Sequence, residues 1–325
     1  HEAAALGEHF VATLPAEPVS RKAAAVALAS WQRLCRQPND AWGRAAVRRL
    51  ARLAEAMMRQ WPEDAESAAA AKLAIDLAAA AADLPAIETI LQGLSPANPD
   101  RAAVLLRGGV AIWQHCRAVD IGPTQSGSEP PSDCGSRAAG WLDQGLALIA
   151  ADPELPAAET PVAIAAAVAR CQIAFQQRDA AAAQLLPLLT HPGYGLWNRL
   201  AEPAPELPGQ LVESGLSCCL RGFTLAGRNG LAIAALAALR ENSAGNPEAA
   251  VRLAATAGLL GQEIVEELQS LAAVAAANEE VPSRLDLLSR LLAVAATPTA
   301  PRSVLLWAAT TLGQLGRAAG PIGAV

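Results

Sequence analysis

Aromatic residues, lysine and long apolar runs are scarce in this sequence of 325 residues. Aromatic side chains make up 3% of it, and Lys22 and Lys72 are its only lysines. The clearest continuous apolar run, 231–239, has nine residues, whereas a membrane-spanning helix needs about 18. The net charge is −6, so the chain lacks the basic field by which general nucleic-acid binders displace counterions. We therefore expect neither a transmembrane segment nor nucleic-acid binding.

What the sequence has in abundance is alanine, about a quarter of all residues. Alanine loses no side-chain entropy in a helix, and strict alternation of Val, Ile and Thr is missing, so helices are favoured over strands. Periodicity and helix breakers predict helices at 3–13, 20–36, 41–60, 64–83, 85–93, 99–118, 136–150, 157–178, 179–190, 209–226, 229–241, 247–276, 283–296 and 302–316. The expected fold class is all-α, with small residues that let helices approach closely.

The prolines recur at roughly the length of a helical hairpin. From Pro62 to Pro96 is 34 residues, which is typical of stacked helix pairs. Two Gly/Pro-rich segments, 118–135 and 193–208, interrupt the later spacing and are interpreted as insertions, the first of them as a mobile loop. We expect helical repeats over 1–246 and a helical continuation or capping region over 247–325.

The chain from 20 to about 242 resembles tetratricopeptide-repeat proteins. The resemblance lies in the hairpin AAAAKLAIDLAAAAADLPAIETILQGLSPANPD and in RDAAAAQLLPLLTHP. In that hairpin, Ala86, Ile90 and Gly93 match the small, bulky and small positions of the family's second helix, while the first-helix pattern is degenerate. The resemblance implies a right-handed superhelical solenoid that binds other proteins, without implying a particular partner.

The expected helix at 41–60 has two distinct faces. Its apolar residues step by three or four positions, and they are Trp42, Ala46, Leu50, Leu53, Met57 and Trp61. Six arginines stand against one acid, Asp40, between positions 33 and 52, and they are Arg33, Arg36, Arg44, Arg48, Arg49 and Arg52. Our candidates for binding an acidic partner are Arg44, Arg48, Arg49 and Arg52. The alternative is a solvated face paired with acids of the next repeat.

One aromatic pair is a candidate for partner binding, and one cysteine pair is a candidate disulfide. Trp197 and Tyr194 lie in a Gly/Pro-rich insertion, where they are candidate partner contacts, whereas the other tryptophans are expected in the core. The six cysteines lack zinc-site spacing, so no metal is expected. Cys116 and Cys134 bracket the 118–135 segment, so a disulfide between them is one hypothesis, and buried or idle thiols are the alternative.

No motif indicates catalysis, and we expect no cofactor and no catalytic residue. The sequence favours a non-enzymatic scaffold or adaptor that binds a partner protein, and membership of a multi-subunit assembly is compatible with it. The alternatives are a structural subunit of an assembly or filament, and an enzyme on a helical toroid. The chain begins at His1, which fits removal of a secretion signal or a trimmed boundary. The sequence does not decide the cellular compartment, although it favours a periplasmic or secreted location over a cytoplasmic one.

Overall fold

A computed structural model describes residues 2–14, 17–35, 41–121, 133–152, 154–155, 161–176, 181–191, 195–201, 207–272, 280–298 and 300–319. The chain folds as two compact units, His1–Ile173 and Ala174–Val325. The boundary expected from the sequence, between 246 and 247, falls inside the second unit. All the regular structure in the described residues is helical, which confirms the all-α class.

The first unit contains the helices α1 (Glu2–Thr13), α2 (Pro18–Cys35), α3 (Ala41–Gln60), α4 (Ala65–Ala80), α5 (Leu84–Gln92), α6 (Arg101–Ile121) and α7 (Cys134–Ala151). Helix α8 (Pro161–Gln176) contains the division between the units. The second unit contains α9 (Ala181–Thr190), α10 (Leu196–Leu200), α11 (Gly209–Leu225), α12 (Asn229–Asn242), α13 (Pro247–Ala272), α14 (Glu280–Ala295) and α15 (Arg302–Ala319).

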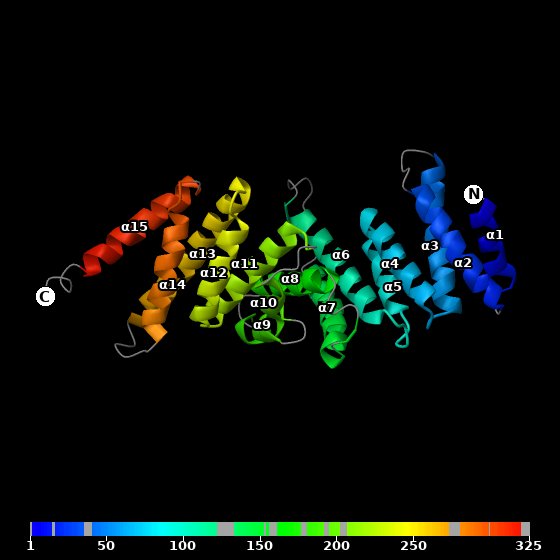
Figure 1. The fold of residues 1–325 in the computed structure, drawn as a ribbon, viewed down its shortest axis with the longest axis horizontal. Helices are drawn as coiled ribbons and strands as arrows, with labels where there is room; N and C mark the ends of the chain where they lie inside the picture. The colour runs from blue at the N-terminus through cyan, green and yellow to red at the C-terminus, as the bar shows by residue number, and fades with distance from the viewer. Residues whose placement is uncertain are drawn as a thin grey trace. The chain divides into compact units, whose positions relative to one another are not determined.

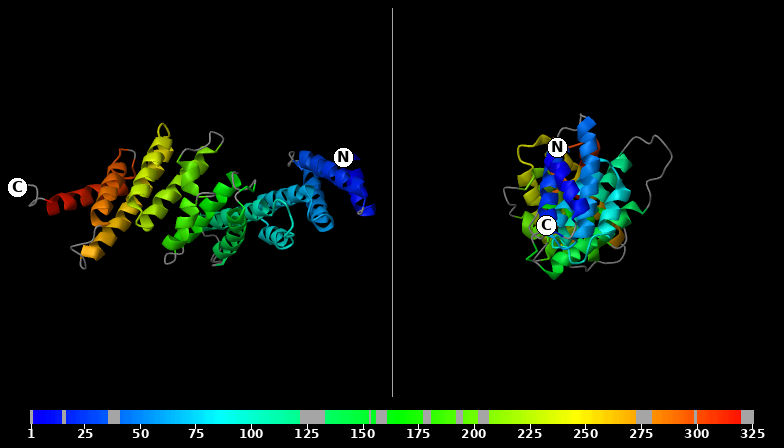
Figure 2. Two further views of the ribbon diagram at one scale, coloured as in Figure 1. Left: turned by 60° about the horizontal axis from the view of Figure 1, so that its bottom comes forward. Right: turned by 90° about the vertical axis from the view of Figure 1, so that its right-hand side faces the viewer.

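Consecutive helices lie side by side within each unit (Figure 1, Figure 2). The main contacts of a helix are with the next helix and with the next but one. In the first unit, for example, α4 packs against α3 and α5 and also against α6 and α2. Packing of this kind buries each apolar face on near neighbours in the chain rather than in one large central core.

The predicted helices are confirmed along the chain, with shifts of a few residues at their ends, except that α10 was missed. Helix α10 lies inside the segment 193–208, which the sequence marks as an irregular insertion. It has five residues, too few for a periodic pattern, and isolated helices of that length are unstable. Burial of Leu196 and Leu200 stabilises this short helix, which its local helix propensity alone would not. The other expected insertion, 118–135, is mostly outside the described residues.

Helix α3 buries the apolar stripe that the sequence predicts. Ala46, Leu50, Leu53 and Met57 are all buried, whereas Trp61 is half-buried, just beyond the end of the helix. The hydroxyl of Ser67 on α4 donates to the Met57 carbonyl oxygen at 2.8 Å, which ties the two helices together. The side chains of residues 41–45, including Trp42, lie outside the described part.

The Gly108-Gly109 pair of α6 marks a close helix contact. A Cβ atom at Gly108 would lie 2.7 Å from the Leu91 side chain, and one at Gly109 would lie 2.8 Å from the Leu142 side chain. Real Cβ atoms do not approach that closely, so a larger residue at either position would force the facing leucine side chain to shift.

Arginine–carboxylate pairs join helices that are next but one in the chain. These pairs are Arg49–Glu8 (3.2 Å), Arg107–Asp76 (2.6 Å), Arg137–Glu88 (2.5 Å) and Arg252–Glu213 (2.6 Å). Arg107 and Arg252 are bidentate, which fixes geometry. Since exposed pairs each contribute only about 0.2–1 kcal/mol, they set the register of the helices more than their stability.

In the second unit, a buried arginine connects three elements. Arg284 of α14 is 7% exposed, and its Nη1 donates to the Thr224 carbonyl oxygen at 2.6 Å and to Asn229 Oδ1 at 2.9 Å. Its other nitrogens face Glu267 of α13. One guanidinium thereby donates to a carbonyl oxygen near the end of α11, to a side chain at the start of α12 and to a carboxylate of α13. Its buried charge is compensated by these partners.

Leu50→Ala tests the packing of α3. Leu50 is fully buried, so we expect the substitution to lower the free energy of unfolding by about 2–4 kcal/mol through the cavity it leaves. Leu6→Ala is the control, because Leu6 on α1 is 58% exposed. Urea denaturation followed by circular dichroism measures both. Equal effects of the two substitutions would contradict the assignment of the α3 core face.

Arg284→Ala and Arg290→Ala on α14 test the buried arginine. We expect Arg284→Ala to lower the free energy of unfolding by about 3 kcal/mol or more, because the Thr224 carbonyl oxygen and Asn229 Oδ1 lose their buried donor and the ion pair with Glu267 is lost. Arg290 pairs with Asp286 at the surface, so its loss is expected to cost less than about 1 kcal/mol. Thermal and urea unfolding measure both variants. An equal decrease in the free energy of unfolding would show that the buried contacts of Arg284 do not stabilise the second unit.

Candidate functional site

One pocket of the first unit lies across α3, α4 and α5, and we call it the α3–α5 pocket. It has a volume of about 770 Å³. Five alanines line it, which are Ala51, Ala74, Ala78, Ala81 and Ala86. Leu77, Met58 and Ile90 supply the larger apolar side chains. The pocket is therefore apolar in lining and of the size in which proteins hold ligands.

Small side chains on facing helices explain why the pocket exists. Ala74, Ala78 and Ala81 recur at intervals of four and three along α4, so they form one stripe. A stripe of methyl groups packs closely where a neighbouring helix covers it and leaves a hollow where none does. The hollow is bounded by α3 on one side and by α5 on the other.

Four charged side chains border the α3–α5 pocket. Arg48, Glu55 and Arg59 all come from α3, and Asp83 precedes α5. The Asp83 carboxylate accepts the backbone N–H of Ala86 at 3.1 Å, so it caps α5 and is stabilised by the helix N-terminus. Within the part of the chain that the structure describes, Arg48, Glu55 and Arg59 form no ion pair. The α3 edge of the pocket therefore carries a net positive charge.

A second, smaller pocket lies between α3 and α1. Its volume is about 370 Å³, and its lining includes Glu8, Arg49, Arg52 and Gln60. Arg49 already has two interaction partners. Its Nη1 lies 3.2 Å from Glu8 Oε2, and its guanidinium lies 5.3 Å from the centre of the Trp31 ring. Gln60 Nε2 donates to the Val11 carbonyl oxygen at 3.4 Å, a long contact that joins the ends of α3 and α1.

The arginines that the sequence groups as a candidate binding surface line two different pockets. Arg48 borders the α3–α5 pocket, whereas Arg52 borders the smaller pocket. Arg49 pairs with Glu8 of α1, which precedes α3 in the chain, rather than with an acid of the next repeat. The side chain of Arg44 lies outside the described residues. Arg59 was missed, although it lies 11 residues after Arg48, three helical turns along the same face.

Trp197 has a structural contact that the sequence did not indicate. Its ring meets that of Phe223 edge to face, with the centroids 6.0 Å apart, and Phe223 is fully buried in α11. Trp197 is half-buried and anchors α10 on α11, which is a packing role. Tyr194, its expected companion, lies outside the described residues.

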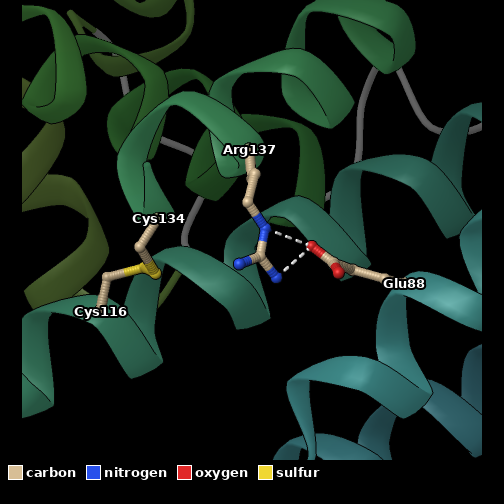
Figure 3. Close-up of a disulfide and its surroundings, with 4 residues drawn as sticks. All are labelled: Glu88, Cys116, Cys134 and Arg137. Carbon is tan, nitrogen blue, oxygen red and sulfur yellow. Dashed lines mark hydrogen bonds and ion pairs between the residues drawn. A yellow bond between two sulfur atoms is a disulfide. The ribbon is translucent and has the colours of Figure 1, made fainter. Parts of the chain in front are cut away.

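Cys116 and Cys134 form a disulfide (Figure 3). Their Cα atoms are 6.2 Å apart, within the range that a disulfide spans, and both residues are buried. The bond joins α6 near its end to the first residue of α7. Next to it, Arg137 of α7 pairs with Glu88 of α5, so two links hold the start of α7 against earlier helices.

Two of the other cysteines, Cys35 and Cys219, have a raised thiol pKa. Cys171, Cys218 and Cys219 are buried, and Cys35 is partly exposed. Burial raises the pKa of the Cys219 thiol well above its usual range, and the neighbouring Cys218 raises it further. Burial also raises the pKa of Cys35. Since the thiolate is the nucleophile, raised pKa values make these thiols poor ones at neutral pH.

Comparison with protein-family models, with curated proteins and with solved structures finds no match for this chain. Within the described ranges, no three His, Cys, Asp or Glu side chains are grouped as a metal site would need. No described helix is both long and apolar enough to cross a membrane. The α3–α5 pocket is therefore assigned from its own geometry.

Removal of the disulfide tests its contribution. The bond closes a loop with a sequence separation of 18 residues, so we expect Cys116→Ser with Cys134→Ser to lower the free energy of unfolding by about 3 kcal/mol. The same loss is expected when the wild-type chain is reduced. Cys35→Ser is the control, because Cys35 is free. A wild-type melting temperature that reductant leaves unchanged would show that the disulfide does not stabilise the fold.

Proposed function

We propose that this chain is a non-enzymatic scaffold that holds a segment of a partner protein in the α3–α5 pocket. The observation that carries the proposal is the pocket itself, about 770 Å³ in volume, lined by apolar side chains from three successive helices. Interfaces place their strongest contacts where an apolar anchor enters a pocket with charged groups at its rim. The α3–α5 pocket has both features.

The walls of this pocket are held in place by contacts outside it. Arg107 of α6 pairs with Asp76 on α4, and Arg137 of α7 pairs with Glu88 on α5. Ser67 ties α4 to the end of α3. A site whose walls are already fixed needs little ordering when a partner binds, which favours affinity.

We further propose that the helices form a right-handed superhelical array like that of tetratricopeptide-repeat proteins. Packing of each helix on the next and the next but one supports this architecture. Arrays of that kind present open surfaces made by several repeats, and binding through them needs no chemistry from the scaffold.

The experiment that tests the function compares partner capture by the wild-type chain with capture by a chain whose pocket is filled. Ala51→Leu with Ala86→Leu adds volume at two half-buried positions of the pocket lining. Ala69→Leu with Ala79→Leu is the matched control, since both residues are exposed on α4 and neither lines the pocket.

We expect proteins captured from extracts of the source cells by the wild-type and control chains to be lost from the filled variant. Quantitative mass spectrometry measures the difference, and circular dichroism confirms that all three chains are folded. Capture that is equal for the filled and control variants would refute the assignment of the pocket as the binding site.

A further inference from the structure

We infer that the occupant of the α3–α5 pocket is an amphipathic helix that carries large apolar side chains on one face and carboxylates at the edge of that face. The inference rests on the proposed function and adds the chemistry of the partner. It depends on three properties of the pocket: the size of its lining side chains, its length along α3, and the charges that α3 presents.

The small side chains of the lining favour a helix with large ones. Ala51, Ala78 and Ala86 offer methyl groups from three different helices, so the backbone of an incoming helix can approach closely. Complementary packing then requires the partner to supply the volume, as leucine, methionine or phenylalanine would. A helix displays such residues on one face at intervals of three and four.

The length of the pocket matches a short helix. Arg48 and Arg59 border the pocket at positions 11 residues apart on α3, which corresponds to about 16 Å along the helix axis. Three turns of a partner helix cover the same distance, and three turns present about three or four apolar residues on one face.

The charges of the α3 edge favour carboxylates on the partner. Several arginines of the described chain that lie beside another helix are paired with acids, as Arg107 is with Asp76 and Arg252 is with Glu213. Arg48 and Arg59 border a pocket and have no such partner within the described residues. The border also has two acids, Glu55 between the arginines on α3 and Asp83, whose carboxylate caps α5. Docking of an apolar face would exclude water beside these arginines, which strengthens their attraction for carboxylates.

A peptide selection tests the inference and does not require the cellular partner to be identified. A phage library of helical peptides with randomised surface positions is selected on the full chain and counter-selected on Ala51→Leu with Ala86→Leu. The expected pocket-dependent binders are enriched in Asp and Glu beside a stripe of Leu, Met or Phe. Pocket-dependent binders with a neutral or basic average charge, or without an apolar stripe, would overturn the inference.

Charge reversal on α3 gives the second measurement. The most enriched peptide, labelled with fluorescein, is titrated by anisotropy against Arg48→Glu with Arg59→Glu, and we expect its affinity to fall by about tenfold or more. Arg33→Glu with Arg240→Glu is the matched control, because it changes the net charge equally at exposed arginines that line neither described pocket. We expect the control to change the affinity by less than about twofold.

The outcomes separate this inference from the function on which it rests. Loss of cellular partners from the filled variant, together with selected peptides that are not acidic, would keep the binding function and reject the acidic helix. Equal affinity of the enriched peptide for the two charge-reversed variants would likewise reject the charge complementarity. Pocket-dependent binding of a single-stranded oligonucleotide or of anionic vesicles, in place of the acidic peptide, would assign the arginines to phosphate and overturn the inference.

Discussion

Close contact between helices through alanine and glycine is the constraint on which the rest of this structure depends. A methyl group or a hydrogen at the contact lets neighbouring backbones approach, as at Gly108 and Gly109 of α6, but it buries little apolar area at each position. The larger buried side chains, such as Leu50 and Met57, therefore carry much of the stability. The result is a succession of thin contact layers, each shared by near neighbours in the chain.

The α3–α5 pocket follows from the same constraint. The alanine stripe of α4 that permits close packing leaves a hollow where α3 and α5 do not cover it. Ion pairs to α6 and α7 hold α4 and α5, and the disulfide holds α7 on α6, so these links outside the pocket fix its walls. Packing, register and the candidate site therefore have one physical origin, which is the distribution of small side chains along the helices.

Most of the fold could be predicted from the sequence because its signals are local. The apolar stripe of α3 and the breakers between helices locate the elements, and the helix period alone indicates that Leu50 faces the core. Helix α10 was missed because its five residues depend on tertiary burial of Leu196 and Leu200, which local patterns do not report.

The site was only partly predictable, because it depends on which helix faces which. The sequence singled out Arg48, but it also grouped Arg48 with Arg49 and Arg52, which the structure assigns to an ion pair with Glu8 and to a different pocket. The alanine stripe of α4 and the position of Arg59 were visible as spacings. That these residues line one pocket depends on how α3, α4 and α5 pack together, which spacing along the sequence does not indicate.

Photo-crosslinking in the source cells, from a residue inside the α3–α5 pocket, tests most directly whether a partner binds there. A benzoylphenylalanine at Thr89, an exposed residue of the pocket lining, is compared with the same group at Thr310, an exposed residue of α15. We predict a partner adduct from position 89 that is absent from position 310. Adducts of equal yield from both positions, or from position 310 alone, would contradict the assignment of the pocket as the binding site.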